Sequence, residues 1–388
     1  MAVATPDPER GAAVLDAAPV APSAAAEERI SVASNWTLVW WRFRKHRLAL
    51  GSMAVLAALY AVVVCPEFFA THDPEATDAR LAFIPVQRIH LLDGWRVRPW
   101  VPGVTGKRNP TTLRMEWQVD PARKVPVGVL VPGPPYRLLG VIPARVHLVG
   151  AAAGADRERV HLLGTDRLGR DQWSRLMHGT QTSMTIGLVA VTLSVVLGIV
   201  LGGVSGYFGG MPDQVIQRLI ELLQSLPTIP IWLALTAALP RDWSPARVFF
   251  AITVILALVG WTTLAREVRG RFLALREEDF VIAAELAGCS RRRVILRHMV
   301  PTFLSHIIAT STLAIPAMII NETSLSFLGL GLRPPAISWG VLLQEAQNLQ
   351  TVALAPWLLV PGLVVIVSVL AFNLVGDGLR DAADPYSH

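Results

Sequence analysis

Residues 282–301 read IAAELAGCSRRRVILRHMVP and lie between two long apolar runs, at 248–264 and 303–320. The stretch carries four arginines and a histidine, although its first half consists of helix-forming residues. Charged side chains are costly inside a bilayer, whereas the two neighbouring runs have the composition of membrane spans. This alternation predicts a chain that crosses a membrane several times and keeps residues 282–301 in a loop outside the lipid.

The composition of the whole chain is that of a polytopic membrane protein. Of 388 residues, 52% are hydrophobic and 16% are charged, and the mean hydropathy is +0.45. A soluble protein usually carries about a quarter of charged residues. A helix needs about 20 apolar residues to cross the hydrocarbon core, and lipid offers no partner for an open backbone. The predicted spans are 48–64, 185–208, 222–240, 248–264, 303–320 and 351–375.

Lysines and arginines in the short loops predict the orientation of these spans. If the N-terminus lies inside, the inner segments carry fourteen basic residues and the short outer loops carry three. Basic residues collect on the cytoplasmic side, so both termini and the loop with residues 282–301 are predicted to be cytoplasmic. The inner set is Arg42, Arg44, Lys45, Arg47, Arg218, Arg266, Arg269, Arg271, Arg276, Arg291, Arg292, Arg293, Arg297 and Arg380, and the outer set is Arg241, Arg247 and Arg333.

The chain divides into four predicted parts. Residues 1–40 are rich in Ala, Pro and Glu and are expected to form a disordered cytoplasmic tail. Residues 41–70 hold the first transmembrane helix. Residues 71–180 are expected to form an extracytoplasmic insert with a surface helix. Long loops cross the membrane largely regardless of their charge, so the basic residues of this insert are not counted in the orientation. Residues 181–388 form a core of five transmembrane helices with a cytoplasmic loop at 266–301.

The cytoplasmic loop has the pattern of a helix, a tight turn and a second helix. Acidic residues at 277–279 suit the first turn of a helix, where the helix dipole favours them. Gly288 can adopt the positive φ that ends this helix, and Ser290 is a good N-cap for the next one. The small side chains of Ala283, Ala284 and Gly288 leave a face that can fit closely against another protein.

This stretch resembles the "EAA" loop of importer permeases in the ATP-binding-cassette (ABC) superfamily. The family pattern is Glu-Ala-Ala, three residues, Gly, nine residues, then Ile-x-Leu-Pro. Here residues 282–284 are Ile-Ala-Ala, Gly288 matches, and residues 298–301 are His-Met-Val-Pro. The first Glu and the Ile of the pattern are absent here. In these departures the stretch resembles the peptide-importer branch more than the sugar branch.

Three further segments carry the same resemblance. They are LLGTDRLGRDQWSRLMHGTQTSM at 162–184, NETSLSFLGLGLRPPAISWG at 321–340 and FNLVGDGLRDAADP at 372–385. With the span pattern, the resemblance covers about residues 40–70 and 160–388. Gln181 stands where the family often has Arg, so no role is carried over to that position. The chain is identified as similar to the C-type permease subunit of dipeptide and oligopeptide importers.

The resemblance implies the fold and the partners. It implies an all-α polytopic protein with six transmembrane helices, of the type I ABC importer permease fold, with a small β-rich outer insert. Such a permease forms half of a pathway for peptides in the bacterial cytoplasmic membrane. Its implied partners are a second homologous permease, two ATP-binding subunits and an extracytoplasmic substrate-binding protein. The implied ATPase-coupling residues are Ala283, Ala284, Glu285, Gly288, Ser290, Arg293 and Pro301.

The motifs of catalysis are weak or missing. GVTGKRN at 103–109 resembles a P-loop only superficially, because its glycine spacing is wrong and no Ser or Thr follows the Lys. The HExxH, GxSxG and paired-cysteine patterns do not occur, and Cys65 and Cys289 are predicted to lie on opposite sides of the membrane. We therefore expect no catalytic residue, cofactor, metal site or nucleic-acid partner, and ATP hydrolysis by a separate chain. Two alternatives to a peptide importer stay open. One is the same architecture with an oligosaccharide or metal chelate as its cargo, and the other is an ion-coupled secondary transporter.

Two sets of residues within the spans invite a functional interpretation. Asn321 and Glu322 follow the fifth span and form either a mouth or gate contact of the pathway or a polar bond to a neighbouring helix. Gly198, Gly202 and Gly206 recur every four residues and let another helix approach closely. Prolines are expected to kink the spans, either for ordinary packing or along the pathway. They are Pro227, Pro230, Pro316, Pro356 and Pro361.

The insert has the pattern of strands. RIHLLDGWRVRPWV at 88–101 alternates between apolar and polar residues, and YRLLGVIPARVHLVG at 136–150 has the pattern of a strand pair. We predict a small β-rich module that docks a binding protein, contacts the second permease or is a tolerated insertion. Asp166 is expected to cap a surface helix that runs along the membrane.

Overall fold

Long apolar helices dominate the computed structural model, which describes residues 35–93, 95–111, 115–152, 160–240 and 242–383. Within these ranges, five helices are long and apolar enough to cross a membrane, and one bent pair makes a sixth candidate span. A small sheet is also present, so the predicted fold class is confirmed. The five long helices are Arg47–Val64 (α3), Gln172–Phe208 (α5), Pro245–Leu275 (α8), Arg291–Phe327 and Pro356–Ala382.

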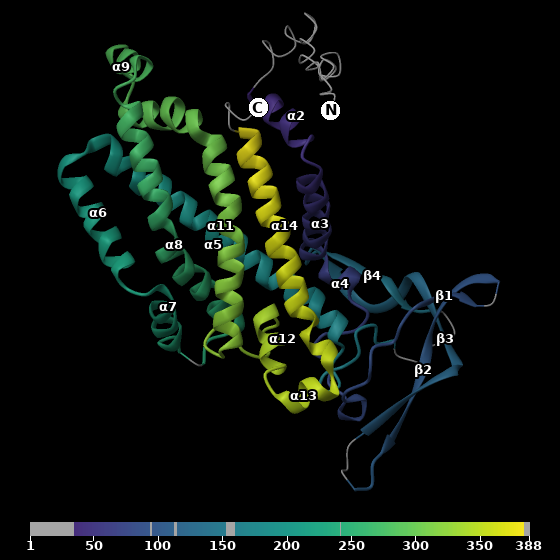
Figure 1. Cartoon of the computed structure of the whole chain (residues 1–388). Coiled ribbons are helices and arrows are strands. Elements are labelled where there is room, and N and C mark those ends of the chain that lie inside the picture. The colour runs from purple at the N-terminus through teal and green to yellow at the C-terminus, as the bar shows by residue number, and fades with distance from the viewer. Residues whose placement is uncertain (1–34, 94, 112–114, 153–159, 241, 384–388) are drawn as a thin grey trace, which may run out of the picture.

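The helices form a bundle with two distinct ends. Figure 1 shows α2 (Asn35–Phe43), α9 (Asp279–Leu286) and the C-terminal end of α14 (Val360–Ala383) at one end. The opposite end holds α12 (Trp339–Glu345) and α13 (Leu349–Leu354). Residues 1–34 of the predicted tail at 1–40 lie outside the described residues. The tail is predicted to extend to residue 40, but helix α2 already begins at Asn35.

The predicted third span, 222–240, is not a single straight helix. Its residues are divided between α6 (Gly210–Ser225) and α7 (Thr228–Ala237), which meet at an angle of 88°. Leu226 and Pro227 between them are extended. Proline removes a backbone donor and disfavours the helical conformation in the residue before it, which explains the break.

The three regularly spaced glycines lie where α5 crosses α8. A Cβ atom at Gly202 would stand 2.4 Å from the carbonyl oxygen of Ala265, and one at Gly206 would stand 2.7 Å from that of Arg269. A Cβ at Gly198 would press against Leu264 at 3.1 Å. These positions leave no room for a side chain, so the two backbones approach directly.

Other spans differ from the prediction at their ends. The last span starts at Pro356 and not at 351, because Pro356 opens a 3₁₀ turn (η5, Pro356–Leu359) and Pro361 follows in the first turn of α14. Proline suits a helix start, where its missing donor is not needed. Among the prolines predicted to kink helices, Pro316 lies in the interior of α11 (Leu304–Phe327), whereas Pro230 and Pro361 stand in the first turns of α7 and α14.

The second span also begins earlier than predicted. Helix α5 is continuous over 37 residues from Gln172, so residues 172–184 belong to the span helix and do not form a separate surface helix. Asp171 caps it by accepting a hydrogen bond from the backbone N–H of Ser174. The prediction that Asp166 is the cap is wrong, and its carboxylate is used in ion pairs instead.

The predicted loop at 266–301 is shorter than expected, because α8 runs on through Leu275. After α9, a short helix α10 (Arg291–Arg293) continues through a π-helical stretch (η3, Val294–Met299) and a 3₁₀ turn (η4, Val300–Phe303) into α11. The helix predicted after Ser290 is therefore continuous with the fifth span.

The insert is a meander of four antiparallel strands in the order β1-β2-β3-β4, within the described residues. Val101 of β2 pairs with Val125 of β3, and both are buried with Val127 and Val160 in a small core of their own. His147 of β4 connects the sheet to the bundle, because its Nδ1 lies within hydrogen-bond distance of the backbone carbonyls of Glu67 and Ala70, just after α3. The strands are His90–Asp93 (β1), Arg96–Arg108 (β2), Met115–Leu138 (β3) and Ile142–Ala151 (β4).

Candidate functional site

The first candidate site is the helix–turn–helix that joins α8 to α11. Its root is the fully buried side chain of Val281 in α9, which packs in one apolar cluster with Phe272, Val294 and Met299. These partners come from α8 and from the π-helical stretch that leads to α11. Close-packed side chains therefore connect α9 to two membrane spans.

The opposite side of α9 is apolar and exposed. Phe280 is 41% exposed, Ile282 44% and Leu286 84%. Residues four apart share a face of a helix, so Ile282 and Leu286 form one apolar ridge. The predicted small residues Ala283 and Ala284 lie beside this ridge, exposed and half-buried respectively. An apolar ridge on a short helix at the end of the bundle is a surface that a protein partner can cover.

The turn after α9 depends on backbone conformation. Gly288 has φ +76°, and its N–H donates to the carbonyl of Glu285 at 2.9 Å. A Cβ added at Gly288 would meet nothing within 4 Å, so glycine is needed here for its conformation and not for close packing. The carbonyl of Ser290 accepts from Val294 at 3.0 Å, but the Ser290 hydroxyl makes no capping bond.

Two contacts tie this loop to the end of α5, and the sequence analysis missed both. The hydroxyl of Tyr207 donates to the carboxylate of Glu285 at 2.5 Å. The guanidinium of Arg291 lies 5.6 Å from the centre of the Phe208 ring. Arg293 and Pro301, which were also predicted, are exposed. The adjacent aromatic pair at 207–208, just before the next loop, was the available sequence signal.

The second predicted site, Asn321 and Glu322, lies in α11. The carboxylate of Glu322 is fully buried and accepts from Ser183 of α5 at 2.8 Å and from Ser326 at 2.9 Å. The hydroxyl of Ser183 also accepts from the N–H of Trp339 at 3.1 Å. This geometry matches the alternative of a bond to a neighbouring helix, whereas Asn321 is only half-buried. A role in the pathway remains a prediction.

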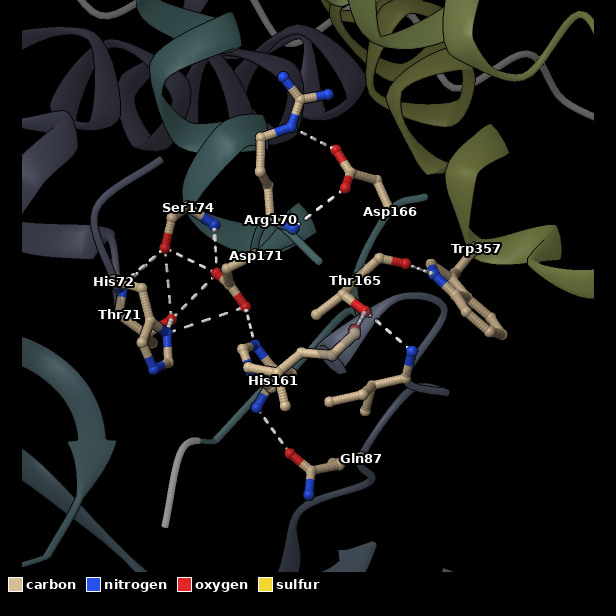
Figure 2. Close-up of polar contacts among 12 residues, drawn as sticks. Thr71, His72, Gln87, His161, Thr165, Asp166, Arg170, Asp171, Ser174 and Trp357 are labelled. Atoms are coloured by element: carbon tan, nitrogen blue, oxygen red, sulfur yellow. Dashed lines mark hydrogen bonds and ion pairs between the residues drawn. The ribbon is translucent and has the colours of Figure 1, made fainter. Parts of the chain in front are cut away.

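A network of buried ion pairs lies where the insert joins the bundle, and Figure 2 shows its pair of Asp166 and Arg170. Asp166 accepts from Arg170 at 2.7 Å and from the fully buried Arg175 at 2.6 Å. Both arginines also bind Glu345 of α12, at 2.7 and 2.8 Å. Burial raises the pKa of Glu345, but the hydrogen bond and the charge of Arg175 outweigh it and keep that pKa below its ordinary value.

Beside these ion pairs lies a second buried group around Asp171, visible in Figure 2. One oxygen of Asp171 accepts from the hydroxyls of Ser174 and Thr71, at 2.7 and 3.1 Å. The other lies 2.8 Å from Nδ1 of His161 and 3.9 Å from Nδ1 of His72. Burial raises the pKa of Asp171, but the contact with His161 and the proximity of His72 lower it more, so the net shift is downward.

Sequence reasoning did not predict this junction. Asp166 and Asp171 stand in the quoted stretch 162–184, yet their partners are far away along the chain. Glu345 is 170 residues from Arg175, and His72 is 89 residues from His161 by number. A local pattern cannot indicate such pairs. The visible signal was the density of charged residues immediately before an apolar span.

Comparison with known proteins identifies the family. The family model described as "Binding-protein-dependent transport system inner membrane component" matches residues 173–386. A second model, "N-terminal TM domain of oligopeptide transport permease C", matches residues 34–85. The two models together cover both membrane parts of the chain and leave the sheet outside.

Three relatives agree with these models. The oligopeptide transport system permease protein of Bacillus subtilis (strain 168) is 35% identical over 226 residues, which are 58% of this chain and 72% of that protein. The protein of the same description from Escherichia coli (strain K12) is 38% identical over 235 residues, 60% and 75% of the two chains. The dipeptide transport system permease protein of Alkalihalophilus pseudofirmus is 36% identical over 226 residues, 58% and 72%. From these matches, which span the transmembrane core and the loop with α9, the chain belongs to the family of binding-protein-dependent transport system inner membrane components, in its branch of C-type oligopeptide and dipeptide ABC permeases.

Proposed function

We propose that this chain is the permease subunit of an ABC importer that carries dipeptides or oligopeptides across a bacterial cytoplasmic membrane. The observation that carries the proposal is the family match over the transmembrane core, because the matched region includes the loop with the exposed ridge of α9. A permease of this family is a membrane subunit, and ATP is hydrolysed by a partner chain.

The coupling step is assigned to α9. Its ridge of Ile282 and Leu286 docks on an ATP-binding subunit, and its root at Val281 passes the movement of that subunit into α8 and α11. The bond between Tyr207 and Glu285 links the same movement to α5. Among the residues predicted for coupling, Gly288 sets the angle between α9 and the helix that follows, because its positive φ makes the turn.

The remaining partners follow from the proposed role. A second homologous permease forms the other half of the pathway, and each permease engages one of two ATP-binding subunits. A substrate-binding protein delivers the cargo at the opposite end of the bundle from α9. Both termini then lie on the cytoplasmic side, in agreement with the excess of fourteen basic residues over three.

The orientation has a direct test. In a variant without Cys65 and Cys289, a cysteine at Arg292→Cys is expected to resist an impermeant thiol reagent in intact cells. A cysteine at Arg333→Cys is expected to react, because Arg333 is exposed at the other end of the bundle. Labelling of position 292 with protection of position 333 would reverse the whole assignment.

The function itself is tested by reconstitution. The chain is placed in liposomes with its partner permease, two ATPase subunits and the binding protein, and uptake of a peptide panel is compared with an oligosaccharide and a metal chelate. Leu286→Asp is expected to abolish uptake and ATPase co-purification without unfolding the chain, because this side chain is 84% exposed. Leu139→Asp is the control for ATPase co-purification, since Leu139 is 60% exposed on the insert, which lies away from α9 (Figure 1). Normal peptide uptake with Leu286→Asp would exclude the proposed coupling, and uptake of only non-peptide cargo would exclude the proposed substrate.

A further inference from the structure

Two histidines and an aspartate meet at the junction between the insert and the bundle, as Figure 2 shows. His72 follows the short helix α4 (Pro66–Phe69), His161 precedes the ion-pair network, and Asp171 caps α5. One nitrogen or oxygen atom from each residue lies within 4.8 Å of the other two. We propose that these three residues bind a transition-metal dication, with Zn²⁺ as the ion that suits them best.

The ligand set supports zinc. Imidazole nitrogen and carboxylate oxygen are typical zinc ligands, and three protein ligands with one open position make an exchangeable site. Calcium and magnesium prefer oxygen ligands only, so two imidazoles disfavour both. His72 is 24% exposed at its side chain, which gives an ion and a water molecule access from solvent. His161 and Asp171 are almost fully buried.

The distances are close to those of a metal site. Zinc–nitrogen and zinc–oxygen bonds are about 2.1 Å, so two ligands at a tetrahedral angle stand about 3.4 Å apart. The measured separations from the Asp171 oxygen are 2.8 Å to His161 Nδ1 and 3.9 Å to His72 Nδ1, one shorter and one longer than this value. Shifts of about half an ångström in each ring bring both Asp171 separations to this value, and the two imidazole nitrogens, which lie within 4.8 Å of each other, must close on the ion as well.

The two rings are placed to make these shifts. The imidazoles of His72 and His161 are stacked, with centres 4.9 Å apart and planes 21° from parallel. Each has a nitrogen near the same oxygen of Asp171, so both nitrogens lie on one side of the stack. Within the described residues, Nε2 of His161 has no hydrogen-bond partner that would hold its ring in place. Nδ1 of His72 lies 3.0 Å from the hydroxyl of Thr71, a contact that metal binding replaces.

The charge balance also favours a cation here. A buried carboxylate is costly unless a positive charge compensates it. The nearby guanidinium groups of Arg170 and Arg175 are bonded to Asp166 and Glu345, not to Asp171. Among the described residues, no guanidinium or ammonium group bonds to Asp171, so a bound cation would compensate its charge. Because metal ions and protons compete for the same ligand atoms, metal binding is expected to weaken at low pH.

The proposal is tested on the full chain, purified with a histidine-free tag and stripped with a chelator. Zn²⁺ titration against a chromophoric indicator is expected to give one equivalent per chain and a higher unfolding temperature. Co²⁺ in its place is expected to give the visible absorption of a low-coordinate site, whereas Mg²⁺ and Ca²⁺ leave the unfolding temperature unchanged.

Variants distinguish this site from adventitious binding. His72→Gln is expected to weaken zinc binding at least tenfold and to remove the Co²⁺ absorption. It is expected to keep the fold, because the side chain of His72 is 24% exposed. His161→Gln is expected to weaken zinc binding in the same way. His90→Gln is the matched control, because His90 is an exposed histidine of the insert that stacks on Trp100. Equal zinc affinity in the wild type and His72→Gln, or no stoichiometric binding in the wild type, would overturn the proposal. Neither result depends on transport, so the proposed function is tested separately.

Discussion

Gly288 shows how one residue can be essential for its backbone alone. Its φ of +76° lies in the left-handed region, which costs other residues about 1–2 kcal/mol. We predict that Gly288→Val leaves the permease inserted but reduces ATP-driven uptake strongly, because the turn between α9 and α10 is lost. Gly288→Asn is expected to keep more of the uptake, since asparagine tolerates this conformation. The two variants are compared in proteoliposomes at equal protein content.

A steric effect of the new side chain and a backbone effect of the turn predict different uptake for Gly288→Val and Gly288→Asn. No atom lies within 4 Å of a Cβ at Gly288, so neither side chain is excluded by packing. If Asn and Val reduce uptake equally, the effect comes from the surface that the partner covers and not from the turn.

Glu345 makes the stability of the junction depend on pH. Its pKa is held below the ordinary value of 4.5 by Arg175, so its contribution to folding is fully present above that pH. The contribution is lost as the pH falls through the lowered pKa of the folded state. Glu345→Gln is expected to destabilise the chain by about 3–5 kcal/mol at pH 7, because it leaves Asp166 as the single carboxylate partner, among the described residues, of Arg170 and the buried Arg175.

The measurement is thermal unfolding of both proteins in detergent between pH 7 and pH 3.5. The difference between wild type and Glu345→Gln is expected to shrink as the pH falls below 4.5. A difference that stays constant over this range would show that the ion pair does not account for the destabilisation.

Helices α5 and α8 depend on glycine for their close contact. Gly202→Ala places a Cβ 2.4 Å from the carbonyl oxygen of Ala265, which forces the two backbones apart. Overpacking of this kind costs about 1–3 kcal/mol, and we predict a lower unfolding temperature. Gly270→Ala is the matched control in α8, because nothing lies within 4 Å of its Cβ and alanine favours a helix. Equal unfolding temperatures for the two variants would contradict the packing.

Local signals predicted some elements well and others poorly. Apolar runs and strand alternation indicated the spans and the sheet, and Gly288 marked its turn, because these signals lie within a few residues. The bend at Pro227 has a local signal too, but the uncharged run 222–240 predicts one span, whereas the structure divides it between α6 and α7. The early part of α5 carries Arg175, which bonds to Glu345, and no pattern near residue 175 indicates that partner.

The whole molecule consists of a membrane bundle and a sheet that attaches at one junction. His147 of the sheet bonds to the carbonyls of Glu67 and Ala70, and Trp117 bonds to that of Ala82. The sheet can therefore be removed by an excision that is shorter than the whole insert. The segment before β1 must be kept, because Ile84 and Gln87 bond to Thr165 and His161.

Excision of 90–151 with a short Gly/Ser bridge is expected to preserve membrane insertion and ATPase assembly. Uptake at limiting cargo is expected to fall several-fold, because the sheet belongs to the end of the molecule where the binding protein is proposed to dock. Uptake is measured with and without the binding protein. Long surface insertions cost little thermodynamically, so unchanged uptake would identify the sheet as a tolerated insertion.

The central claim is that α9 carries the contact with the ATP-binding subunit. The most direct measurement is photo-cross-linking in membranes that contain the assembled transporter, with the cross-linking residue at position 286 in α9 or at position 139 in the insert. We predict an adduct with the ATP-binding subunit from position 286, whose native leucine is 84% exposed, and none from position 139. An ATPase adduct from position 139, or its absence from position 286, would contradict the account.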